Sequence, residues 1–156
     1  MCRLNINDLV AFTAPQLHAI LTAGFFIDYA QRTLVEGFTL EKSFRAILAA
    51  TSQSNLARHT NVVHVYSNDD CSALRVFQYV FIHPKFRPWG QRLPPSCSIC
   101  KSPRSWSLRS SKNETVVFKC KKKNCKGFCQ FVRPDGYEMG KANVNGGHWM
   151  HKSYAV

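Results

Sequence analysis

Hydrophobic residues in the first half of the chain follow two spacings, one strand-like and one helix-like. Apolar and β-branched runs occur at residues 8–13, 61–67 and 73–82. Short runs rich in Val, Ile, Phe and Tyr are typical of strands that are buried on at least one face. About three strands are therefore predicted in this half of the chain.

Two helices are predicted between the first and second of these strands. The first begins at Ala14-Pro15, after Thr13 as N-cap, and ends at Gly37, whereas the second begins at Thr39. The apolar face expected for the first helix consists of Leu17, Ile20, Leu21, Phe25, Tyr29 and Leu34. Strands alternating with helices predict a small α/β unit over residues 1–82.

The second half has shorter β-like runs and more breaks. Four prolines crowd residues 83–96, so this segment is predicted to be a linker. Strand-like runs follow at residues 105–109, 114–119 and 128–133, and a last short strand is expected near 148–150. These runs predict a small antiparallel sheet within residues 97–156.

Two pairs of cysteines lie within this second half. Cys97 and Cys100 form a CxxC pair, and after nineteen residues Cys120 and Cys125 form a CxxxxC pair. Two tight turns can each offer two thiolates, which together fill the tetrahedron that zinc prefers. The sequence therefore predicts one structural zinc ion in a zinc ribbon, and the alternative is that these are free structural thiols.

The fourth zinc ligand has more than one candidate. Cys129 can replace Cys125 as a ligand, or Cys125 and Cys129 can form the second ligand pair and leave Cys120 unused. Residues 128–133, however, resemble a strand leading away from the site, in which Cys129 is a packed residue and not a ligand. His148 and His151 are reserve ligands. We favour Cys97, Cys100, Cys120 and Cys125. The predicted fold class is then α+β, with an α/β unit at residues 1–82, a linker at 83–96 and a zinc-ribbon-like domain at 97–156.

The net charge of +12 is confined to one half of the chain. Residues 1–82 hold six Lys or Arg and six acids, whereas residues 83–156 hold fifteen Lys or Arg and three acids. Such asymmetry indicates two units with different roles. The predicted nucleic-acid contacts are the cations beside the cysteines, namely Lys101, Arg104, Lys121, Lys122, Lys123 and Lys126.

The same basic surface has a second interpretation. Charged side chains can simply keep a small zinc domain soluble, and the cations beside the cysteines offset the negative thiolates without any ligand. The predicted partners are therefore a nucleic acid or an acidic protein.

No arrangement of residues predicts a catalytic site. Cys2 and Cys71 are candidate nucleophiles and His18, His59, His64 and His83 candidate bases, but they form no known catalytic motif. No long apolar segment and no secretory leader is evident. In a reducing compartment, the seven cysteines are better interpreted as metal ligands or buried thiols than as disulfide partners. We expect a non-catalytic intracellular protein, cytoplasmic or nuclear, without membrane contact.

A resemblance to a protein family adds to this interpretation. The segment Leu9-Val10-Ala11-Phe12 through residues 56–63, followed by Phe86-Arg87-Pro88-Trp89-Gly90 and the cysteine pairs, resembles large fungal proteins in which a caspase-like CHAT domain precedes a zinc-ribbon-like tail. The catalytic His and Cys of that family lie on earlier strands, and no residue of this sequence matches them. The resemblance implies an incomplete α/β unit with an uncovered sheet edge. An alternative function is therefore a protein-interaction or regulatory remnant of a CHAT peptidase.

Overall fold

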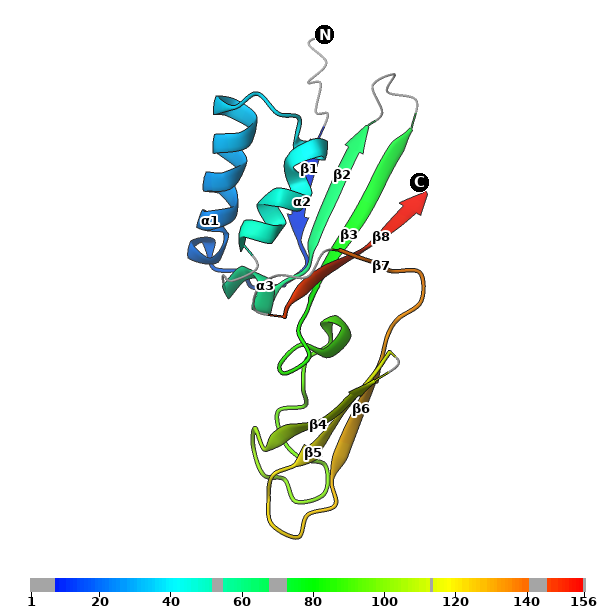
Figure 1. The fold of residues 1–156 in the computed structure, drawn as a ribbon. Helices are drawn as coiled ribbons and strands as arrows, with labels where there is room; N and C mark the ends of the chain where they lie inside the picture. Colours follow the sequence, from blue (N-terminus) through cyan, green and yellow to red (C-terminus); the bar gives the residue numbers. More distant parts are fainter. Residues whose placement is uncertain (1–7, 52–54, 68–72, 113, 141–145, 156) are drawn as a thin grey trace. The chain divides into compact units, whose positions relative to one another are not determined.

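The computed structural model shows a mixed α+β protein with two antiparallel sheets. It describes residues 8–51, 55–67, 73–112, 114–140 and 146–155. The chain divides into two compact units, here named unit 1 (Met1–Phe81 with Tyr137–Val156) and unit 2 (Ile82–Gly136) (Figure 1). This organisation confirms the α+β fold class, whereas the domain boundaries differ from those expected.

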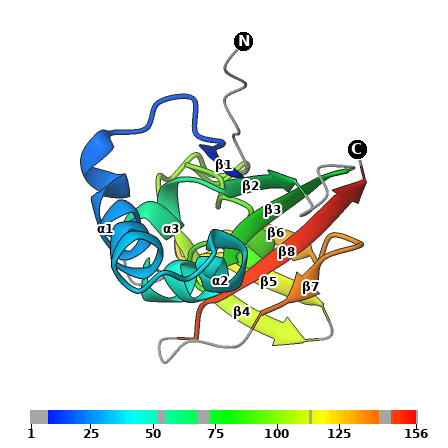
Figure 2. The ribbon, with the colours of Figure 1, turned by 90° about the horizontal axis from the view of Figure 1, so that it is seen from above.

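Unit 1 consists of a five-stranded sheet with helices on one face (Figures 1 and 2). The strands are in the order β1-β2-β3-β8-β7. Their bounds are β1 (Asp8–Phe12), β2 (Val62–Ser67), β3 (Leu74–Ile82), β7 (Glu138–Met139) and β8 (His148–Ala155). The helices are α1 (Ala19–Ala30), a π-helical turn (Gln31–Val35), α2 (Leu40–Thr51) and α3 (Asn55–His59).

The core of unit 1 lies between α2 and the sheet. Phe44 and Ile47 of α2 are completely buried, as is Val62 of β2. The ring of Phe44 stacks on the His64 ring of β2 at a centroid distance of 4.3 Å. Since β2 buries alternate residues, the face carrying Val62 and His64 is the one that packs against the helices.

The first helix begins later than predicted, and its buried face differs from the predicted one. It starts at Ala19, and Phe25 is buried, but Ile20 and Leu34 are 80% and 75% exposed. The expected apolar face was therefore wrong at these two positions. Phe25 lies five positions after Ile20, which places the two side chains about 140° apart around an α-helix. Both cannot face the same core.

The surroundings of His64 and His151 predict that unit 1 becomes less stable in acid. His64 is 1% exposed, and burial lowers its pKa, although the Asp8 carboxylate, 2.8 Å from Nε2, and the charge of Glu41 oppose this. Burial and Arg45 also lower the pKa of His151, against the opposing effect of Glu138. Below about pH 6.5 the unfolded chain therefore binds more protons than the folded chain, so stability is lost as pH falls.

We expect the urea midpoint of unit 1 to drop between about pH 7.5 and pH 5.5, with His64 contributing at most about 1.4 kcal/mol per pH unit. Helical circular dichroism measures this transition, because the described α-helices all belong to unit 1. His64→Phe should flatten the dependence. A midpoint that rises in acid would contradict the assignment of these two histidines as neutral.

Unit 2 contains a three-stranded antiparallel sheet in the order β4-β5-β6. Its strands are β4 (Trp106–Lys112), β5 (Thr115–Cys120) and β6 (Phe128–Val132), close to the three strands predicted for this region. The Pro-rich segment belongs to this unit as well, with a short 3₁₀ turn (Pro88–Gly90). Trp89 and Leu93 pack against the core of the unit. Residues 83–96 are thus part of a folded unit, which differs from the predicted linker.

The C-terminal residues fold with unit 1, so the predicted domain at residues 97–156 ends too late. In β8, Met150 is 1% exposed, and the Trp149 indole donates a hydrogen bond to the Leu48 carbonyl of α2 at 2.7 Å. The Phe81 ring of β3 contacts that of Trp149. The apolar pattern correctly predicted a strand here, but a strand pattern does not specify which sheet it joins.

Among the described residues, no helix is long and apolar enough to cross a membrane.

Candidate metal centre

The four favoured cysteines converge in unit 2. The sulfur atoms of Cys97, Cys100, Cys120 and Cys125 all lie within 4.8 Å of one another. The Sγ atoms of Cys97 and Cys125 are 3.7 Å apart, and those of Cys100 and Cys120 are 3.6 Å apart. The predicted convergence of these four residues is confirmed, and they are close enough to hold one metal ion.

Two tight turns bring these sulfurs together. In the first turn, the Lys101 amide donates to the Cys97 carbonyl at 2.9 Å, and Lys101 has a φ of +58°. In the second turn, Cys120 ends β5, the Cys125 amide donates to the Lys122 carbonyl at 3.1 Å, and Asn124 has a φ of +64°. Asn tolerates this left-handed conformation better than most residues. Each pair therefore presents both of its thiols on one side of its turn.

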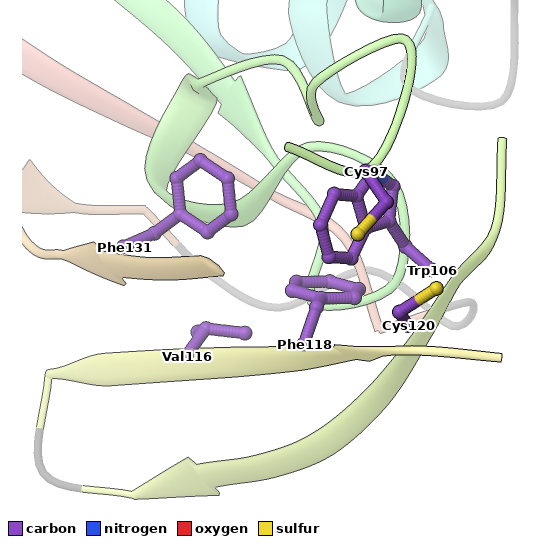
Figure 3. Close-up of a cluster of buried hydrophobic side chains, with 6 residues drawn as sticks. All are labelled: Cys97, Trp106, Val116, Phe118, Cys120 and Phe131. Carbon is purple, nitrogen blue, oxygen red and sulfur yellow. The ribbon is translucent and has the colours of Figure 1, made fainter. Parts of the chain in front are cut away.

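The cysteines are continuous with the small core of unit 2 (Figure 3). That core comprises Cys97, Trp106, Val116, Phe118, Cys120 and Phe131. The Trp106 indole is fixed by a hydrogen bond to the Pro94 carbonyl at 2.8 Å. Because two of the six core residues are metal-ligand candidates, the apolar core alone is too small to stabilise a unit of this length.

The electrostatics of the cluster are compatible with a bound cation. The backbone amides of Cys100 and Ile99 lower the pKa of the Cys97 thiol to about 7. The pKa of Cys125 is instead raised to about 11: the Gly127 amide lowers it, but burial and the three neighbouring sulfurs together outweigh that effect. Four thiolates at this spacing repel one another, so a divalent cation is required to stabilise the fully ionised cluster.

Amide groups also point at the sulfurs. The Lys122 amide donates to the Cys120 sulfur at 3.5 Å, and the Gly127 amide donates to the Cys125 sulfur at 3.4 Å. Such hydrogen bonds stabilise negative charge on a ligand and fix its orientation. The turn backbone therefore supports thiolates at these positions.

Comparison with known proteins identifies no relative of this chain. No protein-family model, curated protein or solved structure matches the chain.

Gly127 is a site residue that the sequence interpretation missed. A Cβ atom at this position would lie 2.4 Å from the Cys97 sulfur and 3.4 Å from the Cys125 sulfur. The Gly127 carbonyl also accepts a hydrogen bond from the Cys120 amide at 2.8 Å, which holds the backbone in place. Only glycine fits between these ligands. The sole sequence signal was a glycine two residues after a ligand cysteine.

The alternative ligands lie elsewhere. Cys129 is half-buried on β6 and packs against the core, outside the group of four convergent sulfurs. Burial raises the pKa of its thiol, and Cys97 adds to this effect. His148 and His151 belong to β8 in unit 1. Of the predicted nucleophiles, Cys2 and Cys71 lie outside the described residues.

The predicted contact cations are all exposed on unit 2. These residues are Lys101, Arg104, Lys121, Lys122, Lys123 and Lys126. Unit 2 holds thirteen Lys or Arg and two acids, a net charge of +11 out of the chain's +12. One of the acids, Glu114, pairs with Arg133 at 3.0 Å. Ile99, Lys122, Lys123 and Lys126 line a shallow depression beside the cysteine turns.

Proposed function

We propose that unit 2 is a zinc-ribbon-like module held by one structural zinc ion. The supporting observation is the spacing of the sulfurs. A tetrahedron with Zn–S bonds of about 2.3 Å has S···S edges of about 3.8 Å. The Cys97–Cys125 and Cys100–Cys120 distances here are 3.7 and 3.6 Å, and all four sulfurs lie within 4.8 Å of one another. The hairpin of β4 and β5 between the two cysteine turns is the ribbon of this proposal.

The zinc of this proposal has a structural role. A catalytic zinc keeps one coordination position for water, and four thiolates fill all positions. The module therefore acts through the surface that the metal stabilises. This argument supports a binding function for unit 2 rather than catalysis.

The surface supports nucleic acid as the partner. Almost the whole excess of positive charge lies on unit 2, and the cations gather around the two cysteine turns. A zinc tetrathiolate contributes two negative charges, which leaves about +9. Exposed cations at this density neutralise phosphates and release counterions. Phe128, exposed beside the second turn, can stack on a base.

A salt titration of the zinc-loaded full chain tests this proposal. We expect binding to labelled DNA and RNA of unrelated sequence, with a log–log salt slope near −3 or steeper, because about three or more phosphates are neutralised. The double variant Lys122→Gln/Lys123→Gln should reduce the magnitude of that slope by about two. The matched control is Arg32→Gln/Lys42→Gln in unit 1, which removes the same charge and should leave the slope unchanged.

Absence of binding at low salt would end the nucleic-acid proposal. Equal slopes for the two double variants would also contradict it, since binding would then depend on net charge rather than on the cysteine turns. Neither result would affect the zinc assignment, because the metal and nucleic-acid measurements are independent.

A second candidate function is protein interaction through unit 1, as implied by the resemblance to the end of a CHAT-type domain. Two observations favour it. β1 is the terminal strand of the described sheet order, and Ile20 and Ile27 on the outer face of α1 are 80% and 69% exposed. Uncovered edges and exposed apolar side chains mark interaction sites. Lack of nucleic-acid binding would favour this candidate.

A further inference from the structure

Unit 1 contains a cavity that the metal centre does not involve. Its volume is about 330 Å³, and it lies between α2 and the sheet strands β3 and β8. Its helix side is formed by Arg45, Ala46 and Ala49, and its sheet side by Tyr79, Trp149 and His151. The space exists because two alanines of α2 face large aromatic side chains. A volume at the lower end of the range for ligand pockets suits a small molecule.

Polar groups converge at one side of this cavity. An Arg45 Nη2 atom lies 3.2 Å from His151 Nε2, and the Glu138 carboxylate lies 3.2 Å from the same nitrogen. One imidazole nitrogen can accept a hydrogen bond from Arg45 or donate one to Glu138, but it cannot do both. The contacts of Arg45 and Glu138 with His151 therefore compete. A ligand that pairs with the guanidinium would resolve this competition.

The charges define which ligand fits. Burial lowers the pKa of His151, with Arg45 adding to the effect, so the ring is neutral near pH 7. Burial raises the pKa of Tyr79 to about 12, although the Arg45 charge opposes it, so its hydroxyl keeps its proton. Arg45 is thus the one permanent cation lining the described cavity, and Glu138 faces it across His151. The Arg45 guanidinium can pair with one carboxylate, and the nearby Glu138 carboxylate disfavours a second negative charge, so a monoanion fits better than a dianionic phosphate.

The remaining lining is apolar. Leu48 and Trp149 lie deeper, and the Trp149 indole N–H is already bonded to the Leu48 carbonyl, so the indole offers its ring as an apolar wall. The ring of His151 stacks near that of Tyr79 at 5.7 Å. The cavity is therefore large enough for several waters or for one small organic ligand.

We propose that this cavity binds a small organic monocarboxylate with a compact apolar body, whose carboxylate pairs with Arg45. Guanidinium and carboxylate form two parallel hydrogen bonds, which fixes the orientation of the ligand. The apolar body then covers Trp149 and the two alanines. This site is independent of the metal centre and of the function proposed for unit 2.

Titration of the zinc-loaded full chain with benzoate and with cyclohexanecarboxylate, followed by NMR signals of His151 and Trp149, tests the proposal. We expect saturable shifts with a dissociation constant of about 1 mM or tighter. Benzamide, the uncharged counterpart of benzoate, should bind at least about tenfold more weakly. Inorganic phosphate should bind more weakly than benzoate.

Two variants locate the ligand. Arg45→Gln should weaken benzoate binding by about tenfold or more, and Ala49→Leu should abolish binding by filling the cavity. Both positions are exposed on α2, so the fold should survive. The matched controls Arg32→Gln and Ala50→Leu should bind as the unmodified chain does. Lack of saturation at about 20 mM of either carboxylate, equal binding of benzamide, tighter binding of phosphate, or unchanged binding in Arg45→Gln would each overturn the proposal.

Discussion

Serine in place of Cys97 or Cys120 is expected to unfold residues 82–136 while unit 1 stays folded. The core of unit 2 is small and includes both of these cysteines. Structural zinc sites contribute about 10–16 kcal/mol of folding free energy, which is far more than such a core supplies. Loss of one thiolate removes most of that energy. Amide NMR spectra should show unit 2 resonances collapsing toward unfolded positions.

The C-terminal strand is expected to stay folded in these variants. Residues 148–155 form β8 in the sheet of unit 1, so their amides should stay protected in both serine variants. The control is Cys129→Ser, a half-buried cysteine outside the cluster, which should retain one zinc and a folded unit 2. A folded, metal-free unit 2 in Cys97→Ser would refute the structural role of the metal.

Gly127→Ala is expected to damage the metal centre without removing any ligand. The new methyl group would lie 2.4 Å from the Cys97 sulfur, which is buried and therefore has little room to move away. Overpacking typically costs about 1–3 kcal/mol, and displacing one ligand should lower zinc affinity by about ten- to a hundredfold. Competition with a chelating dye measures that affinity.

A glycine-to-alanine substitution outside the metal centre provides the matched control. Gly24 on α1 has open space where its Cβ would be, so Gly24→Ala should leave zinc affinity unchanged. It should also slightly stabilise the helix, because alanine favours helices over glycine. Equal zinc affinity for Gly127→Ala and the unmodified chain would mean that Cys97 is not held where the structure places it.

The convergence of the four cysteines was the part of the molecule most open to prediction. Ligand spacing is a local property, since each CxxC-like pair needs only a tight turn to bring its sulfurs together. The strands of unit 2 were predicted for a similar reason, because alternation along a short segment reflects burial on one face. Gly127 was not found, since its role depends on a close approach to Cys97, thirty residues earlier in the sequence.

Two features that the sequence did not reveal depend on contacts distant in sequence, namely the sheet that the last strand joins and the cavity beside Arg45. The pattern around Trp149 predicts a strand, but its sheet is decided by the fit of that side chain against Leu48 and Phe81. The predicted face of α1 failed for a local reason, because Ile20 and Phe25 are five positions apart and cannot both face the core, and Phe25 is the buried one. The cavity beside Arg45 brings together residues from α2 and β8, more than a hundred positions apart. No local pattern carries that information.

X-ray absorption at the zinc edge, combined with metal analysis of the purified full chain, tests the central claim most directly. We predict one zinc per chain with four sulfur neighbours at about 2.3 Å, and the same spectrum for Cys129→Ser. A chain that contains no zinc, that holds iron instead, or whose zinc has nitrogen or oxygen neighbours in place of one sulfur would contradict the closed site of Cys97, Cys100, Cys120 and Cys125.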